Sequence, residues 1–231
     1  RWMNDELYLK LMYRAKMGKR LNLDNPQTYN EKIQWLKLFD QKIIYTEMVD
    51  KYEVKQYVKA KIGDKYVIPT YGVWNCFEDI DFEMLPNQFV LKTTHDSGGV
   101  VICKDKKSFD IKLAQRKINK SLRQRYYLQG REWPYKNVKP RIIAEKYMED
   151  HTTKELRDYK FFCFNGVPRV MFIASDRENE AVETKFDFFD MDFHHLKLTN
   201  GHPNADKALE KPKMFYQMQE LAAELSKNIP Q

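Results

Sequence analysis

The segment FVLKTTHDSGGVVI, residues 89–102, contains two apolar runs separated by a short polar loop. The first run contains one lysine, Lys92, and the loop closes with Gly98 and Gly99. This order predicts a hairpin that brings the lysine and the glycines to the same end. A phosphate group needs a fixed positive charge and closely approaching backbone N–H groups, and glycine permits that approach. The segment therefore predicts a phosphate site, and the alternative is an ordinary hairpin with a glycine turn.

The order of these residues excludes two common phosphate-binding loops. No Gly-Lys-Ser or Gly-Lys-Thr sequence follows the glycines, as it would in a P-loop enzyme. In the protein-kinase clamp the glycine loop precedes the lysine strand, whereas here it follows that strand. A phosphate site in this hairpin would therefore belong to a different class.

The composition points to acidic partners. The chain has 231 residues and a formal net charge of +7, and a basic chain attracts anionic ligands. Much of the excess positive charge lies at residues 104–107 and at residues 112–125, the latter in an expected helix. A solvated helix face explains much of this charge. Attraction to an anionic polymer or to an anionic membrane surface is the alternative. We expect no nucleic-acid partner.

The sequence predicts a cytoplasmic protein. No apolar run approaches the roughly 20 residues that span a bilayer, and the first residues do not resemble a signal peptide. Cys103 and Cys163 lie in apolar runs, far from each other and from Cys76, which favours buried reduced thiols over disulfides. No zinc-binding spacing is present. We expect no membrane span, and peripheral association with the inner membrane face is compatible with the charge.

The pattern of apolar residues predicts an α+β fold. The region before residue 63 is mostly helical, and Thr28 to Glu31 fits a capping box at a helix start. Asn165-Gly166 is a strong signal for a tight hairpin turn. Helices are expected at 28–40, 46–61, 111–125 and 213–227, and strands at 66–69, 88–93, 100–104, 141–148, 158–164, 167–174 and 184–193.

Four ordered motifs resemble the TupA-like (teichuronopeptide-biosynthesis) branch of the ATP-grasp superfamily. They are NPQTYNEK (25–32), HDSGG (95–99), GREWPY (130–135) and DYKFFCFNG (158–166). The resemblance implies a helical N-terminal region at 1–85, followed by two α+β subdomains, 86–144 and 145–231, that clasp ATP between them. It also implies C-terminal strands and magnesium ligands, which we expect beyond Gln231 because no Glu-x-Asn pair occurs in the matching region.

The resemblance assigns nucleotide-binding roles to seven residues. Lys92 would contact the α- and β-phosphates, and its alternative role is a snorkelling lysine. Glu145 would accept a hydrogen bond from the adenine amino group, and its alternative role is a solvated carboxylate at a strand end. Ser97, Gly98 and Gly99 would form a mobile flap over the phosphates. Lys146 and Tyr147 would offer backbone groups to the base.

Other residues would act on the substrate. Lys160 would point at the phosphates or the substrate and would be oriented by Asp158, and Arg177 would contact the transferred phosphoryl group. Surface ion pairs are the alternative for these residues. Arg131 and Trp133 match a substrate loop. We interpret His95 as a hydrogen-bonding residue of its loop, and Asp50 and Lys51 as structural.

The family resemblance implies a ligase that uses ATP and magnesium. Such an enzyme would phosphorylate a carboxylate to an acyl phosphate, which an amine then attacks to give an amide, ADP and phosphate. The branch implies cell-surface polysaccharide biosynthesis, with an acidic glycan acceptor and an amino acid or other amine as partners. An amino acid would be attached to a uronic acid.

Two other functions stay open. A glycosyltransferase is one, because Asp190-Met191-Asp192 is an Asp-x-Asp sequence of the kind that holds a metal and a sugar nucleotide. No βαβ series precedes that sequence, and carboxylates are common in turns. A non-catalytic module that binds ATP or carbohydrate is the other.

Overall fold

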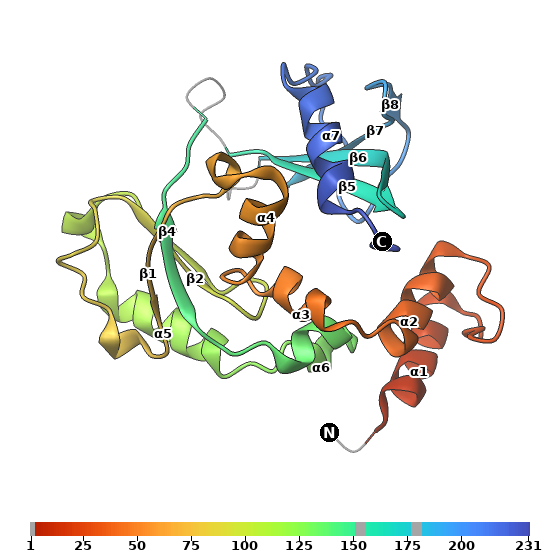
Figure 1. Ribbon diagram of the computed structural model, residues 1–231, viewed down its shortest axis with the longest axis horizontal. Helices are drawn as coiled ribbons and strands as arrows, with labels where there is room; N and C mark the ends of the chain where they lie inside the picture. The colour runs from red at the N-terminus through yellow and green to blue at the C-terminus, as the bar shows by residue number, and fades with distance from the viewer. Residues whose placement is uncertain (1–2, 151–155, 177–181) are drawn as a thin grey trace. The chain divides into compact units, whose positions relative to one another are not determined.

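The structure is a computed structural model that describes residues 3–150, 156–176 and 182–231 (Figure 1). The chain divides into two compact units. Unit 1 consists of residues 1–59 and 67–147, and unit 2 of residues 60–66 and 148–231. Two four-stranded antiparallel sheets, one in each unit, accompany the helices. The fold is α+β, as predicted.

Two capped helices begin unit 1. Helix α1 (Asp5–Met17) ends at Gly18, whose φ of 66° is a conformation that glycine adopts without strain. Helix α2 (Tyr29–Phe39) begins with the predicted capping box. The Thr28 side chain accepts from the N–H of Glu31, and the Glu31 carboxylate accepts from the N–H of Thr28 at 2.9 Å.

The single helix predicted at 46–61 is wrong, because two helices occupy this region. Helix α3 (Ile43–Val49) and helix α4 (Val54–Ile62) are separated by a turn at Asp50. Asp50 has an extended backbone, and its carboxylate accepts from the N–H of Tyr52 at 2.8 Å. An aspartate that satisfies free backbone N–H groups in this way favours a helix boundary over a continuous helix.

The sheet of unit 1 has the strand order β1-β4-β2-β3. Residues 89–103 form the predicted hairpin, and β4 pairs with β2 on its other side. The strands are β1 (Thr70–Trp74), β2 (Phe89–Thr93), β3 (Val100–Cys103) and β4 (Ile142–Lys146).

The strand predicted at 66–69 is also wrong. A short 3₁₀ helix, η1 (Asp64–Tyr66), comes first, and β1 begins at Thr70. Pro69 still takes part in the pairing, because its carbonyl accepts from the N–H of Lys146 at 3.0 Å. The edge strand therefore starts after the proline.

The core of unit 1 lies between the sheet and helix α5 (Ile111–Leu122), which runs along one sheet face in Figure 1. Phe89 and Leu91 point into this core and are fully buried. Successive side chains of a strand point to opposite faces, so Lys92 lies on the face away from α5. The remaining short helices are η2 (Phe77–Asp79), η3 (Lys106–Ser108), α6 (Tyr127–Gly130) and η4 (Trp133–Asn137).

Unit 2 is built on the strand order β5-β6-β7-β8. Asn165 and Gly166 both have positive φ, at 51° and 81°, and form the predicted tight turn between the first two strands. The elements are β5 (Asp158–Phe164), β6 (Val167–Ser175), β7 (Lys185–Phe189), β8 (His195–Leu196) and α7 (Phe215–Leu225).

Both faces of this second sheet are apolar. Met171, Ile173 and Phe189 pack with Phe215 of α7 on one face, whereas Phe172, Ala174 and Phe188 form a second cluster. Lys160 is the register partner of Phe172, so it belongs to the face of this second cluster.

Two sequence expectations about the chain as a whole have structural outcomes. The three cysteines carry free thiols, as predicted, although Cys163 is only half-buried. In the part of the chain that the structure describes, every helix is too short or too polar to cross a bilayer.

Candidate nucleotide-binding site

An ion-paired carboxylate lies at the centre of the sheet face away from α5. Val90 of β2 pairs with Glu145 of β4, which places the neighbouring Lys92 diagonally across from that carboxylate. The Lys92 ammonium lies 2.6 Å from one oxygen of Glu145, and the Lys55 ammonium lies 2.5 Å from the other. The Glu145 side chain is only 7% exposed. The strand register therefore brings the two predicted nucleotide residues together.

Lys55 fixes this arrangement from α4. Its ammonium also donates to the carbonyl of Ile68 at 2.6 Å, and its side chain is 13% exposed. Buried charges are stable when they are paired and hydrogen-bonded, which holds for Lys55 and Glu145. Each carboxylate oxygen has a second acceptor position, so Glu145 keeps the capacity to accept from an amino group.

The loop after Lys92 is fixed at its base. The Asp96 carboxylate accepts from the hydroxyl of Thr93 on β2 and from the hydroxyl of Ser121 on α5. Lys51 donates to the carbonyl of Thr93 at 2.9 Å and to the carbonyl of Asp96. These bonds connect the loop to a strand, to a helix and to the turn before α4. The loop therefore has a preformed base.

The two glycines of the loop serve different purposes. A Cβ at Gly99 would collide with the hydroxyl oxygens of Thr93 and Ser121, so this position admits glycine alone. Gly98 has open space around it but adopts φ 103°, which other residues rarely reach. Ser97 and Gly98 are exposed, whereas Gly99 is buried. The predicted flap therefore consists of an exposed tip on a buried base.

Lys51 is the third lysine of this region. Burial lowers the pKa of Lys51. The negative charge of Asp96 raises this pKa, and the positive charge of Lys92 lowers it. The turn that carries Lys51 is held by Arg141, which pairs with Asp50 at 2.7 Å and with Glu53 at 2.8 Å. Our structural interpretation of Asp50 and Lys51 agrees with these contacts.

The residues after Glu145 offer fewer free groups than the family resemblance implies. The N–H of Lys146 donates to the carbonyl of Pro69, so it is committed within the sheet. The Tyr147 ring lies 5.6 Å from the ammonium of Lys104. Backbone recognition of a base would therefore depend on Tyr147 and on the carbonyl of Lys146.

Arg131 and Trp133 lie in a packed part of unit 1. Arg131 is 6% exposed, and its guanidinium lies 4.5 Å from the ring centre of Tyr8 and 3.5 Å from Asp5 of α1. Trp133 is half-buried and begins η4. The contacts found for Arg131 are to α1 and α6, and none joins it to the Lys92–Glu145 pair among the described residues. The substrate role of both residues stays a prediction.

His95 packs under the loop. Its Nε2 lies 3.1 Å from the carbonyl of Gln124, and the side chain is buried. This contact agrees with the interpretation of His95 as a hydrogen-bonding loop residue.

The predicted catalytic residues belong to unit 2. The Lys160 ammonium lies 3.9 Å from the Asp158 carboxylate and 5.5 Å from the ring centre of Phe172. Lys160 is 57% exposed, so its ammonium is accessible to solvent. The ion pair is compatible with the predicted orienting role of Asp158. Arg177 lies outside the described residues.

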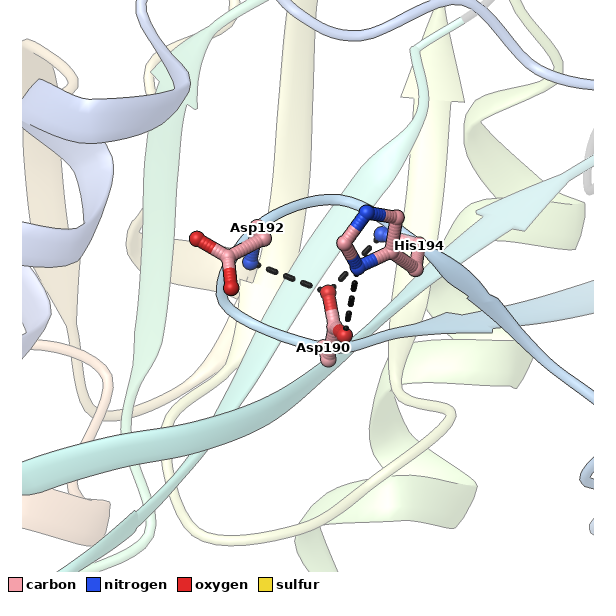
Figure 2. A group of neighbouring side chains, drawn as sticks. All are labelled: Asp190, Asp192 and His194. Atoms are coloured by element: carbon pink, nitrogen blue, oxygen red, sulfur yellow. Dashed lines mark hydrogen bonds and ion pairs between the residues drawn. The ribbon is translucent and has the colours of Figure 1, made fainter.

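The Asp-x-Asp sequence forms a turn stabilised by its own first carboxylate, as Figure 2 shows. One oxygen of Asp190 accepts from the N–H groups of Asp192 and His194, and the other lies 2.9 Å from Nδ1 of His194. These bonds, first that from the His194 N–H, lower the pKa of Asp190. The three side chains could reach one cation, but the hydrogen bonds of Asp190 explain the sequence as a turn.

The comparison with protein families decides the class. A family described as TupA-like ATPgrasp matches residues 31–231. The chain belongs to the TupA-like ATP-grasp family. Searches of curated proteins and of solved structures gave no significant match.

Membership of the TupA-like ATP-grasp family indicates an ATP-grasp ligase. Lys92, at the end of β2 that leads into the loop, carries an ammonium group close to the exposed glycine tip, a combination that would suit the phosphates of ATP. The glycosyltransferase alternative gains no support from the family or from the Asp190 turn.

ATP-grasp enzymes generally use magnesium with ATP, but the carboxylates described beside the loop do not fit such a site. Each of them already accepts from a lysine, an arginine or two hydroxyl groups. These carboxylates are Asp50, Glu53, Asp96 and Glu145.

Sequence reasoning missed several residues of this TupA-like site. Lys55 lies on α4 and no local pattern marked it, because it meets Glu145 only when α4 packs near the sheet. The Asp96–Ser121 contact gave no such signal, because it joins a loop to a helix through tertiary packing alone.

Proposed function

We propose that this protein is an ATP-dependent carboxylate–amine ligase that acts through an acyl phosphate in cell-surface polysaccharide biosynthesis. The observation that carries the proposal is Lys92, held beside a glycine loop with a preformed base in a member of an ATP-grasp family. We propose ATP and magnesium as its cofactors, since ATP-grasp enzymes generally use both. The reaction would join an amino acid to a uronic acid of an acidic glycan.

The proposed reaction has two steps. A carboxylate oxygen of the acceptor attacks the γ-phosphorus of ATP, and the bond from that phosphorus to the bridging oxygen breaks, so that ADP leaves and an acyl phosphate forms. The nitrogen of the amine then attacks the acyl carbon. The bond from this carbon to the phosphate oxygen breaks, the nitrogen loses a proton, and the products are an amide and phosphate.

The protein would act mainly by positioning charge. Lys92 and the N–H groups of the Ser97–Gly98 tip would bind the α- and β-phosphates and leave the γ-phosphoryl group exposed to the acceptor. Glu145 would accept from the adenine amino group at its remaining lone pairs. Lys160, oriented by Asp158, and Arg177 would stabilise the transferred phosphoryl group.

The acceptor class is supported by charge and by the family. A net charge of +7 favours anionic substrates such as a polymer of uronic acids. Reduced cysteines are typical of the cytoplasm, where we propose that the reaction takes place. The same positive charge would allow peripheral binding to the anionic inner face of the membrane.

The products distinguish the candidate functions. The protein is mixed with ATP, magnesium, a mixture of amino acids and an oligomer of galacturonic acid, and nucleotides are separated by chromatography. We expect ADP and phosphate in amounts that depend on both acceptor and amine, and much less from Lys92→Ala. AMP and pyrophosphate would contradict the acyl-phosphate route. Glycosyl transfer from a nucleotide sugar would favour the glycosyltransferase, and ATP binding without turnover would favour the non-catalytic module.

A further inference from the structure

A cavity of about 180 Å³ lies between α1 and α2, which Figure 1 shows side by side, and is bordered by the last residues of α6. All of these elements belong to unit 1. Lys16 and Met17 at its rim are exposed, so the cavity is reached from solvent. Neither the fold nor the nucleotide site accounts for it.

The walls of the cavity are held in place. The Tyr8 hydroxyl donates to the carbonyl of Gln129 at 2.8 Å, and the Lys37 ammonium donates to the carbonyl of Gly130 at 3.0 Å. Leu9 and Tyr13 are buried in the small core of the helical region. The cavity is therefore fixed by α1, α2 and the end of α6 together.

The cavity carries positive charge without a carboxylate in its lining. Lys16 and Lys37 both line it, and its lining contains no aspartate or glutamate in this fully described part of the chain. Burial lowers the pKa of Lys37, and the charge of Lys16 lowers it further, although Glu132 nearby opposes this. An anion between the two lysines would relieve their repulsion.

The remaining lining suits a polar ring. Asn30, Gln34 and Gln129 provide amide groups that both donate and accept, which is what sugar hydroxyls require. Tyr8 and Tyr13 also line the cavity, so the apolar face of a sugar can meet the parts of their rings that Arg131 and the helical core leave uncovered. An apolar cavity of about 150 Å³ accommodates one benzene molecule, so this volume suits a single ring.

We propose that this cavity binds one uronic acid unit of the acidic glycan acceptor, with its carboxylate between Lys16 and Lys37 and its ring beside the tyrosines. The proposal rests on the proposed ligase function, because it identifies where the acceptor is held. The cavity would hold one sugar unit of the glycan. None of its lining residues takes part in the proposed chemical steps, so these residues would position the acceptor.

Charge reversal tests the site with a matched control. Lys16 and Arg14 are both exposed basic residues in the last turn of α1, but only Lys16 lines the cavity. Tri-galacturonate is titrated into the wild type, Lys16→Glu and Arg14→Glu without nucleotide, and binding is measured by calorimetry. Neutral galactotriose and inorganic phosphate are titrated as comparison ligands, and thermal unfolding checks that each variant folds.

We expect Lys16→Glu to bind tri-galacturonate at least tenfold more weakly and Arg14→Glu to bind like the wild type. Galactotriose and phosphate should each bind at least tenfold more weakly than tri-galacturonate to the wild type. Equal loss in both variants, no loss in Lys16→Glu, or no binding of tri-galacturonate to the wild type would overturn the proposal. Equally tight binding of phosphate would show a simple anion site and would overturn it too.

The outcome is separable from that of the ligase proposal, because this titration contains no ATP. ADP formation with the galacturonate acceptor, but without binding at this cavity, would refute the proposed acceptor site and leave the ligase proposal standing. The predicted binding without ADP formation would support the acidic-sugar site and refute the ligase proposal.

Discussion

Replacing Glu145 by glutamine tests whether this carboxylate organises the nucleotide site. The change keeps the size of the side chain but removes its charge, so Lys55 and Lys92 lose their common counter-charge. The amide oxygen of a glutamine accepts from one ammonium, while its NH₂ group faces the other. We therefore expect lower stability and a displaced lysine.

The magnitude follows from the contacts. At an effective dielectric constant of about 20, each pair at 2.5–2.6 Å has a gross attraction of about 6 kcal/mol, much of which offsets the desolvation of the three charges. Breaking a buried pair costs about 3–5 kcal/mol. Lys92 is 28% exposed, and the amide keeps one hydrogen bond. We therefore expect Glu145→Gln to lower the free energy of unfolding by about 3 kcal/mol, at the lower end of this range.

The assay is urea unfolding followed by circular dichroism at neutral pH, with Glu6→Gln as the control. Glu6 and Lys10 form an ion pair of 2.5 Å, as short as Lys55–Glu145, but both side chains are about half exposed. Exposed pairs at this helical spacing contribute about 0.3–0.5 kcal/mol, so Glu6→Gln should change stability little. If Glu145→Gln costs no more than Glu6→Gln, the carboxylate does not organise the two lysines and our reasoning fails.

Three further perturbations test the loop and its surroundings. Lys92→Ala should weaken ATP binding in calorimetry by about 1.5–3 kcal/mol, the value of a charge-assisted hydrogen bond, whereas Lys112→Ala, an exposed control on α5, should not; equal affinities for Lys92→Ala and wild type would exclude the phosphate role. Gly99→Ala should destabilise the protein by about 1–3 kcal/mol or more in urea, because its Cβ meets two hydroxyl oxygens; wild-type stability would mean that the base of the loop is loose. Burial raises the pKa of Tyr127 and Tyr135 from 10.0 to about 12, so above pH 10 the unfolded chain loses these phenol protons while the folded protein keeps them, and stability falls between pH 10 and 12 with no further loss from these groups at higher pH; ultraviolet titration should lose one late step in each Phe variant, and ordinary titration of both would contradict the burial.

Elements with strong local signals were predicted from sequence. The capping box at Thr28, the Asn165-Gly166 turn and the hairpin around the glycine loop each depend on neighbouring residues, and the structure confirms all three. The edge strand β1 was misplaced for a physical reason. Its sequence contains Gly72, which weakens strand propensity, and its pairing has an irregularity between Thr70 and Gly72.

The site was only partly predictable because its contacts are tertiary. Lys92 and the glycines that we propose for phosphate binding lie within eight residues of one another in the sequence, so a motif shows them. The Glu145 pairing with Lys55 depends on the position of α4 against the sheet, and the helix boundary at Asp50 that sets this position was not predicted. A pattern of residue types reveals which groups are present, whereas the sheet register decides which of them meet.

The sharing of one carboxylate by two lysines assigns different roles to those lysines. A single ammonium neutralises Glu145, so the second is in surplus when an anion approaches. Lys55 is the less exposed of the two and is also bound to the carbonyl of Ile68, which makes it costly to move. Lys92 is twice as exposed and lies at the start of the glycine loop. We therefore propose that Lys92 turns to a phosphate while Lys55 stays paired with Glu145 and holds it in place.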